Sequence, residues 1–140
     1  MSERGHLGET LAARYLVRRG WRIVARNWSG AGGELDIVAL RAGVLAFVEV
    51  KTRAQASELD DPIRHGQRLR LITAARLFLD RRPDLSEVSA RFDVIAIDMG
   101  RRRRRIDHIP GAFEMEASVD TPASPTRGIR GYATDWKDRR

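Results

Sequence analysis

The chain has 140 residues, of which 42% are hydrophobic, and this size suits one globular domain. A net charge of +7 and a pI near 11.0 indicate a polyanionic partner, either nucleic acid or an acidic membrane face. Because the chain has no cysteine, disulfides, zinc–thiolate sites and thiol nucleophiles are excluded. No segment is apolar enough to span a membrane and residues 1–10 lack a signal-peptide core, so we expect a cytoplasmic protein.

The first half of the chain predicts one helix and three strands. Residues 2–19 form the predicted helix, whose apolar residues repeat at helical spacing: Leu7, Leu11 and Tyr15, with Ala12 and Leu16 beside them. Residues 21–28 alternate as a strand, and the glycine-rich residues 29–33 predict a turn. Residues 34–40 and 44–51 predict a β-hairpin around residues 41–43.

The second half predicts one helix and two strands. After a polar loop at residues 53–61, a helix begins at Pro62 and runs to residue 80, with the apolar stripe Leu69, Ile72, Ala75 and Leu79 and with Leu71 and Phe78 adjacent to it. Residues 91–98 form a strong strand, and residues 105–109 a weaker one. The order α-β-β-β-α-β-β predicts an α/β fold in which helices flank a mixed β-sheet.

The domain is predicted to cover residues 1–116. From about residue 117 onward the sequence is rich in Ser, Thr, Pro and Gly and has no hydrophobic periodicity. A segment of this kind cannot bury enough apolar surface to offset its ordering entropy. We therefore expect a disordered C-terminal tail at residues 117–140.

Charged residues interrupt the apolar hairpin at two places. Glu34 and Asp36 lie on one strand, and Glu49 and Lys51 on the other. If a two-residue turn at residues 42–43 sets the register, Asp36 lies opposite Glu49 and Glu34 opposite Lys51, with all four side chains on one face. The other positions of both strands are apolar on both faces, which predicts a hairpin that is covered on both sides.

Three carboxylates and one ammonium in a covered, apolar hairpin carry an excess of negative charge that must be balanced. Two carboxylates about 4 Å apart repel by about 4 kcal/mol at an effective dielectric constant of about 20, so that a pKa rises or a cation binds. Oxygen ligands favour Mg²⁺, Mn²⁺ or Ca²⁺ over zinc, and Asp36, Glu49 and the Val50 carbonyl could supply a partial coordination shell. The alternative is a surface hairpin in which Glu34 and Lys51 form an ordinary cross-strand ion pair.

Lys51 is unusual in this chain, because all but two of the 26 basic residues are arginine. An ammonium is a compact donor whose pKa responds to its environment, which a guanidinium cannot match. A lysine at this position therefore indicates a functional charge.

The order Asp36, a gap of 12 residues, and Glu49-Val50-Lys51 resembles the PD-(D/E)XK nuclease superfamily. More closely, the chain is similar to the YraN-like family of small bacterial proteins, which resemble Holliday junction resolvases. The matching segments lie between residues 5 and 113: Gly5-His6-Leu7-Gly8-Glu9 with Ala12 and Tyr15-Leu16, Arg26-Asn27, Gly33-Glu34-Leu35-Asp36-Ile37-Val38, Phe47-Val48-Glu49-Val50-Lys51-Thr52-Arg53, Arg91-Phe92-Asp93-Val94-Ile95, and His108-Ile109 with Ala112-Phe113.

This resemblance implies a restriction-endonuclease-like core and a set of roles. Asp36 and Glu49 would bind the metal ion, and Lys51 would orient or help deprotonate the attacking water. Glu9 would approach the site from the first helix, although from sequence alone it reads as a solvated helix charge. The family often has a lysine where this chain has Gly66 or Gln67, so the resemblance assigns no DNA contact to the second helix.

Other features leave alternatives open. Arg101, Arg102 and Arg103 begin a run of five arginines that, with Arg53, forms a candidate nucleic-acid-binding surface, or else a solvated hairpin tip. Asp93 is a candidate for the acidic face or for a role at the sheet edge. His108 is a candidate core residue whose polar atoms are satisfied.

The leading hypothesis is a Mg²⁺- or Mn²⁺-dependent endonuclease that hydrolyses phosphodiester bonds in DNA, with branched or flapped DNA as candidate substrates. A homodimer is an option, because resolvases cut two strands. The first alternative is a nucleic-acid-binding protein that has the nuclease-like fold without turnover. The second is an interaction protein whose basic surface contacts an acidic partner.

Overall fold

The computed structural model describes residues 3–53, 65–100 and 104–113. The predicted tail at residues 117–140, the first residues of the predicted second helix and Arg101, Arg102 and Arg103 lie outside the described residues. The elements follow in chain order: α1 (Glu3–Arg18), β1 (Arg22–Gly30), β2 (Gly33–Arg41), β3 (Val44–Arg53), α2 (His65–Asp80), the 3-10 helix η2 (Pro83–Leu85), β4 (Ser89–Asp98) and β5 (Arg105–Phe113). The predicted α/β class and the order α-β-β-β-α-β-β are confirmed.

The five strands form one mixed sheet in the order β1-β2-β3-β4-β5. Neighbours pair antiparallel except for β3 and β4, which are parallel. A parallel pair needs a long crossover, and α2 lies within that connection. The β2–β3 pairing runs from Arg41–Val44 to Ile37–Val48, which is the register that the two-residue turn predicted.

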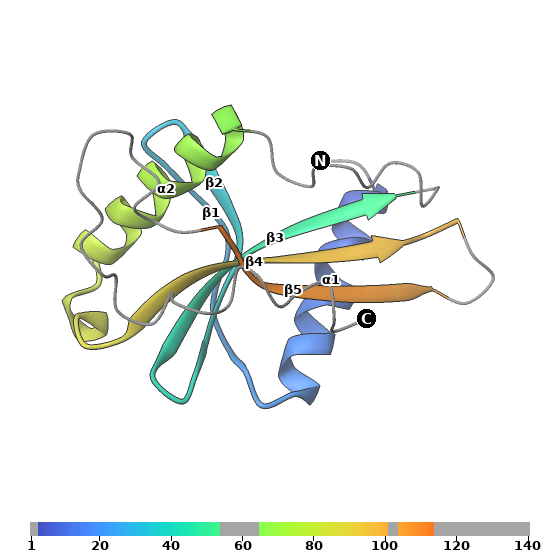
Figure 1. Ribbon diagram of the computed structural model, residues 1–140, viewed down its shortest axis with the longest axis horizontal. Helices are drawn as coiled ribbons and strands as arrows, with labels where there is room; N and C mark the ends of the chain where they lie inside the picture. Colours follow the sequence, from blue (N-terminus) through green and yellow to red (C-terminus); the bar gives the residue numbers. More distant parts are fainter. Residues whose placement is uncertain (1–2, 54–64, 101–103, 114–140) are drawn as a thin grey trace.

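One helix covers each face of the sheet (Figure 1). The core on the α2 face contains Val38, Leu45 and Phe47 together with Phe78 of α2. The core on the α1 face contains Ile37 and Ala46 of the strands, packed against Ala12 and Leu16 of α1. The hairpin is therefore buried on both sides, as its apolar sequence predicted. Neither helix of the described chain is long and apolar enough to cross a membrane.

The predicted apolar stripes of both helices are confirmed except at their first residues. Leu7 is 39% exposed and Leu69 is 43% exposed, so the stripes are wrong at these two positions. The buried side chains include most of the other predicted residues and three that were not predicted, Glu9, Ala13 and Ala74; the full buried set is Glu9, Ala12, Ala13 and Leu16 of α1, and Leu71, Ile72, Ala74, Ala75 and Phe78 of α2. Glu9 thus lies on the buried face of α1.

Strand ends differ from the expected ones by a few residues. β1 continues to Gly30 and β2 begins at Gly33, so the predicted five-residue turn is shorter. β5 extends to Phe113 instead of residue 109. The extension follows a register shift between Phe92 and Val94 of β4, after which Phe92 pairs with Phe113.

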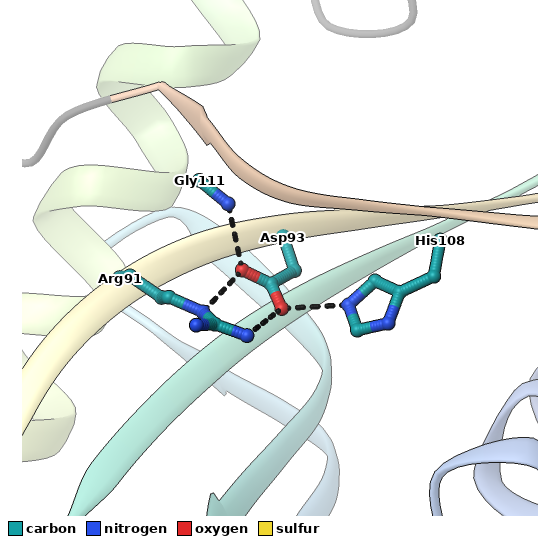
Figure 2. Close-up of polar contacts among 4 residues, drawn as sticks. All are labelled: Arg91, Asp93, His108 and Gly111. Atoms are coloured by element: carbon teal, nitrogen blue, oxygen red, sulfur yellow. Dashed lines mark hydrogen bonds and ion pairs between the residues drawn. The ribbon is translucent and has the colours of Figure 1, made fainter. Parts of the chain in front are cut away.

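A buried polar cluster lies at this shift (Figure 2). Asp93 is fully buried and accepts hydrogen bonds from Arg91 Nε at 2.9 Å, Arg91 Nη2 at 3.1 Å and the Gly111 amide at 3.0 Å. Its Oδ2 also lies 2.7 Å from His108 Nε2. Asp93 thus has a structural role between β4 and β5, and His108 is a core residue with a partner, as one of the sequence alternatives proposed.

Candidate active site

The candidate site lies where β2 and β3 separate. Their pairing ends at Ile37–Val48; beyond this point Glu34 pairs with Ser29 of β1, and Lys51 pairs with Ala96 of β4. The Val50 amide, which has lost a ladder partner on β2, donates to Asp36 Oδ2 at 2.9 Å. The Asp36 carboxylate thus fills the gap between the strands, and the expected Glu34–Lys51 pair across the hairpin is replaced by these contacts.

Asp36 and Glu49 form a half-buried carboxyl pair. The two groups lie within hydrogen-bonding reach of each other. Burial, followed by the charge of Asp36, raises the pKa of Glu49 from 4.5 to about 8. Burial also raises the pKa of Asp36, while the Val50 amide and the hydrogen bond from Glu49 oppose this shift. Glu49 is therefore the group of the pair that holds the proton at neutral pH.

Lys51 and Gln67 complete a ring of contacts around Glu49. Lys51 Nζ lies 3.4 Å from Glu49 Oε1 and donates to Gln67 Oε1 at 3.2 Å. Gln67 Nε2 donates to Glu49 Oε1 at 3.0 Å. The amide of Gln67 therefore bridges the acid and the ammonium and sets the direction in which each side chain points. While Glu49 is protonated, its contact with Lys51 is a hydrogen bond to a neutral acid.

Glu9 approaches this pair from α1. Its side chain is 3% exposed, and both of its carboxylate oxygens are buried without a hydrogen-bond partner among the described residues. Burial, followed by the charge of Asp36, raises the pKa of Glu9, whereas Arg26 opposes this shift. A buried carboxyl without partners is costly, so this position favours a bound cation, water or polar ligand nearby. The solvated-charge interpretation of Glu9 is wrong.

An open hollow of about 580 Å³ gives access to the pair from the α2 face. Its walls include Glu34, Asp36 and Glu49 from the strands, and Gln67 and Arg70 from α2. Glu34 is exposed at the rim, where its Oε1 accepts a hydrogen bond from Ser29 Oγ at 3.4 Å. Three acidic residues and one arginine thus face the same solvent-accessible space.

Two glycines allow the helices to come this close. A Cβ on Gly33 would lie 2.6 Å from the Arg70 carbonyl oxygen, so α2 packs directly on the start of β2. A Cβ on Gly8 would clash with the Thr52 methyl group, so the N-terminal part of α1 packs on the end of β3. Close approach of this kind is a common reason for glycine, and here it brings Gln67 and Glu9 to the site.

Of the predicted nucleic-acid-binding residues, the structure describes only Arg53. Arg53 is 5% exposed at the end of β3, and its carbonyl accepts a hydrogen bond from the Met99 amide at 2.6 Å. Arg53 is therefore a buried side chain and not a surface contact. Arg101, Arg102 and Arg103 lie outside the described residues.

The residues that are present fit a hard divalent cation. No group of three histidine, aspartate or glutamate side chains in the described ranges 3–53, 65–100 and 104–113 is arranged to hold a metal ion. Mg²⁺, however, is commonly bound by one or two carboxylates, with waters and substrate phosphate as the other ligands. Asp36 and Glu49 supply such a pair, and the orphaned oxygens of Glu9 add negative charge beside it.

Fold and site together define a small α/β protein with an acidic site at the junction of two central strands. The chain belongs to the UPF0102 family: the model of "Uncharacterised protein family UPF0102" matches residues 8–97. This membership confirms the resemblance to YraN-like bacterial proteins. The matched segment contains Glu9, Asp36, Glu49 and Lys51 but ends before Arg101.

Similar proteins occur in distant bacteria and carry the name UPF0102 protein. One from Synechococcus sp. (strain JA-3-3Ab) is 42% identical over 121 residues, covering 79% of this chain and 91% of the relative. One from Roseiflexus castenholzii is 44% identical over 114 residues, covering 79% and 92%. One from Myxococcus xanthus is 40% identical over 114 residues, covering 80% and 90%. These likenesses cover nearly the full length of the relatives.

Sequence reasoning missed Gln67 and Arg70 as parts of the site. The signal for Gln67 was present, because it precedes Leu71 by one helical turn and so shares the buried face of α2. A polar residue on a buried helix face calls for a polar partner. The signal was missed because the predicted stripe began at Leu69, which is exposed, and did not extend back to residue 67.

Proposed function

We propose that this protein is a metal-dependent nuclease that hydrolyses phosphodiester bonds in DNA. The observation that carries the proposal is the half-buried Asp36–Glu49 pair, with Lys51 beside it, at the wall of an open hollow. A carboxyl pair that is partly removed from water costs stability unless a proton or a cation compensates it. Perturbed acids in a cleft are typical of functional sites.

Asp36 and Glu49 would hold Mg²⁺ or Mn²⁺, with the Val50 carbonyl as a further oxygen donor. When bound there, such an ion would stabilise negative charge on a phosphate oxygen and make a water molecule more acidic. The donor set of carboxylate and carbonyl oxygens favours these ions over zinc.

The other residues would bind and orient the reacting groups. Lys51 carries a positive charge at the site and would donate a hydrogen bond to a phosphate oxygen or orient the attacking water. Gln67 would keep the ammonium in place through its contact with Lys51 Nζ. Glu9 would hold a water or an ion from the α1 side through its unpartnered oxygens.

The test is cleavage of a labelled flap or four-way-junction DNA in the presence of Mg²⁺ or Mn²⁺. We expect Lys51→Ala and Asp36→Asn each to reduce the cleavage rate by about 100-fold or more, which is typical for loss of a charged group at a phosphoryl or acyl site. Lys137→Ala, which removes the only other lysine, is the matched control and should cleave at the wild-type rate.

Calorimetric titration with Mn²⁺ gives a second readout that needs no turnover. We expect wild type to bind the ion and Asp36→Asn to bind it much more weakly. Cleavage that persists in both variants at the wild-type rate would identify a contaminating nuclease and contradict the proposal. Salt-sensitive DNA binding without cleavage under any of these conditions would favour the non-catalytic alternative.

A further inference from the structure

We propose that the hollow between α1 and β1 is the surface along which a phosphodiester strand leaves the acidic site. This inference rests on the proposed function and adds the path of the substrate. The hollow has a volume of about 330 Å³ and lies on the α1 side of the molecule. The side chains that line it are Thr10, Ala13, Arg14, Val17, Arg18 and Arg26.

The chemistry of this surface suits a nucleic-acid strand. Val17 is 56% exposed, and Arg14 and Arg18 lie beside it on the same stripe of α1. The hollow thus combines an apolar floor with a cationic rim. Guanidinium groups bind phosphate oxygens through two parallel hydrogen bonds, and an apolar floor accommodates sugar and base edges.

The arginines of the rim are available to an anion. In the part of the chain that the structure describes, Arg14 and Arg18 form no ion pair. Other arginines differ: Arg82 contacts Asp84 at 2.8 Å and Arg105 contacts Asp107 at 3.2 Å. Exposed charges without acidic partners supply the sequence-independent part of nucleic-acid affinity.

Arg26 connects this hollow to the candidate active site. It lies on β1 opposite Ile37, whose side chain belongs to the core on the α1 face, so both side chains project toward α1. Its charge acts on Glu9, which in turn is influenced by Asp36. β1 is an edge strand of the sheet, and it lines both hollows, with Ser29 and Gly30 at the acidic one and Arg26 at this one. A strand whose scissile phosphate lies at the acidic site would therefore cross the edge of the sheet along β1, beside Arg26, before it reaches α1.

Helix geometry gives the spacing of the contacts. At 1.5 Å per residue, Arg14 lies roughly 7 Å and Arg18 roughly 13 Å along α1 from Glu9. A nucleic-acid strand advances about 3.4 Å per nucleotide along a duplex axis, so these distances correspond to roughly two and four nucleotides. The two arginines, which lie on successive turns of α1, would thus contact phosphates about two nucleotides apart on the same strand, on one side of the scissile bond.

The first test measures DNA binding as a function of salt. The probe is a fluorescein-labelled flap DNA, and anisotropy is recorded in EDTA so that no cleavage occurs. Each phosphate contact contributes about 0.7 to 0.9 to the slope of log K against log [salt]. We expect Arg14→Ala/Arg18→Ala to reduce the slope by about 1.4 to 1.8 and the affinity at 0.1 M salt by roughly 25- to 60-fold. Alanine favours the helix, so α1 should remain folded.

The matched control is Arg41→Ala/Arg76→Ala, which removes the same charge from two exposed arginines outside the hollow. We expect its slope to equal that of wild type. Suppose that the wild-type protein cleaves the DNA. An unchanged salt slope in Arg14→Ala/Arg18→Ala, or an equal loss of slope in the control, would then overturn this inference and leave the proposed function standing. A wild type that binds no DNA would overturn both proposals, and tighter binding of poly-glutamate than of DNA would identify an acidic protein partner instead.

A second test locates the strand directly. Because the chain has no cysteine, Val17→Cys introduces the only thiol. A flap DNA with a disulfide-activated tether on the phosphate three nucleotides from the branch should cross-link to this variant. Thr73→Cys on the exposed side of α2 is the control and should not react with the same DNA. Equal cross-linking at both positions would overturn the proposed path.

Discussion

Glu49 is the side chain through which pH and metal ions should act on this protein. Its side chain is 11% exposed, and burial raises its pKa from 4.5 to about 8. In an unfolded chain the same carboxyl group ionises near its ordinary value. The folded state therefore binds one proton more than the unfolded state between these two pH values, and stability is linked to pH by that difference.

The first prediction is that stability falls as pH rises through this window. Below pH 4.5 the stabilising contribution of the protonated Glu49 is complete, and it is lost as pH rises toward 8. We expect the free energy of unfolding in EDTA to decrease by about 2 to 4 kcal/mol from this site. Urea unfolding at a series of pH values measures the effect, and Glu49→Gln should remove most of it.

The second prediction concerns the metal ion. A cation that binds the ionised pair displaces the proton, so affinity for Mg²⁺ should rise with pH across the same window. The rise in Tm produced by Mg²⁺ should accordingly be larger at pH 8 than at pH 6. Equal shifts in wild type and Asp36→Asn would show that the ion binds elsewhere.

The third prediction concerns Gln67 as a positioning residue. Its amide contacts Lys51 Nζ at 3.2 Å and Glu49 Oε1 at 3.0 Å, so Gln67→Ala should release both groups. Hydrogen bonds to charged groups contribute about 1.5 to 3 kcal/mol, and partial exposure should reduce the observed loss of stability to about 1 kcal/mol. The NMR measurement uses protein whose lysines are labelled with ¹³C at the ε position. In Gln67→Ala, the chemical shift of Lys51 should move toward that of free lysine.

The chain is well suited to this measurement, because Lys51 and Lys137 give only two signals. Lys137→Arg assigns them. Gln67→Glu is the second variant, since it keeps an acceptor for Lys51 but places a carboxylate against Glu49. A Lys51 signal that does not move in Gln67→Ala would contradict the positioning role, whatever happens to stability.

At the scale of elements, helix positions were predicted more accurately than helix orientation. The apolar pattern placed both helices correctly, but the first residue of each predicted stripe does not pack on the sheet. Ala13 and Ala74, which the stripes omitted, are buried, while the larger Leu7 and Leu69 remain exposed. Hydrophobicity alone ranks leucine above alanine, so the pattern could not reveal which face packs.

The strands were predicted well where they pair and less well where they separate. The turn at residues 42–43 set the β2–β3 register, and alternation then assigned Ile37 and Val38 to opposite faces correctly. Leu35 departs from this alternation and packs in the α2-side core, because β2 has already left β3 at that point. Sequence periodicity holds no information about where a ladder ends.

The fourth prediction concerns the stability of the pairing between β4 and β5. Asp93 balances the positive charge of Arg91, whose side chain is only 10% exposed. Asp93→Ala would leave this charge buried without its main partner, and removal of one member of a buried pair typically costs about 3 to 5 kcal/mol. Urea unfolding should show this loss, with amide exchange in β5 faster than in β2.

The exposed Asp80 on α2 supplies the control for that variant, because Asp80→Ala removes the same group from the surface. Substitutions at such positions usually change stability by less than about 0.5 kcal/mol. Similar losses for Asp80→Ala and Asp93→Ala would show that the cluster in Figure 2 does not hold the two strands together.

For the whole molecule, the order of elements sufficed to predict the fold class, whereas the site depends on contacts that sequence order does not specify. The carboxyl pair follows from the hairpin register. Glu9 and Gln67 reach it only because α1 and α2 pack at two glycines, Gly8 and Gly33, on opposite faces of the sheet. The function of those glycines is visible only when the partner backbone or side chain is in place.

The fifth prediction concerns the division of the chain into a domain at residues 1–116 and a tail. Both core clusters consist of residues between 12 and 113, so a chain that ends at residue 116 keeps every packed side chain of the described structure. We expect its free energy of unfolding to match that of the full chain within about 0.5 kcal/mol, because substitutions and deletions away from the core rarely cost more. The urea m-value should also be nearly unchanged, since it follows the surface exposed on unfolding. A clearly smaller m-value in the shortened chain would show that residues 117–140 pack against the domain and contradict the predicted boundary.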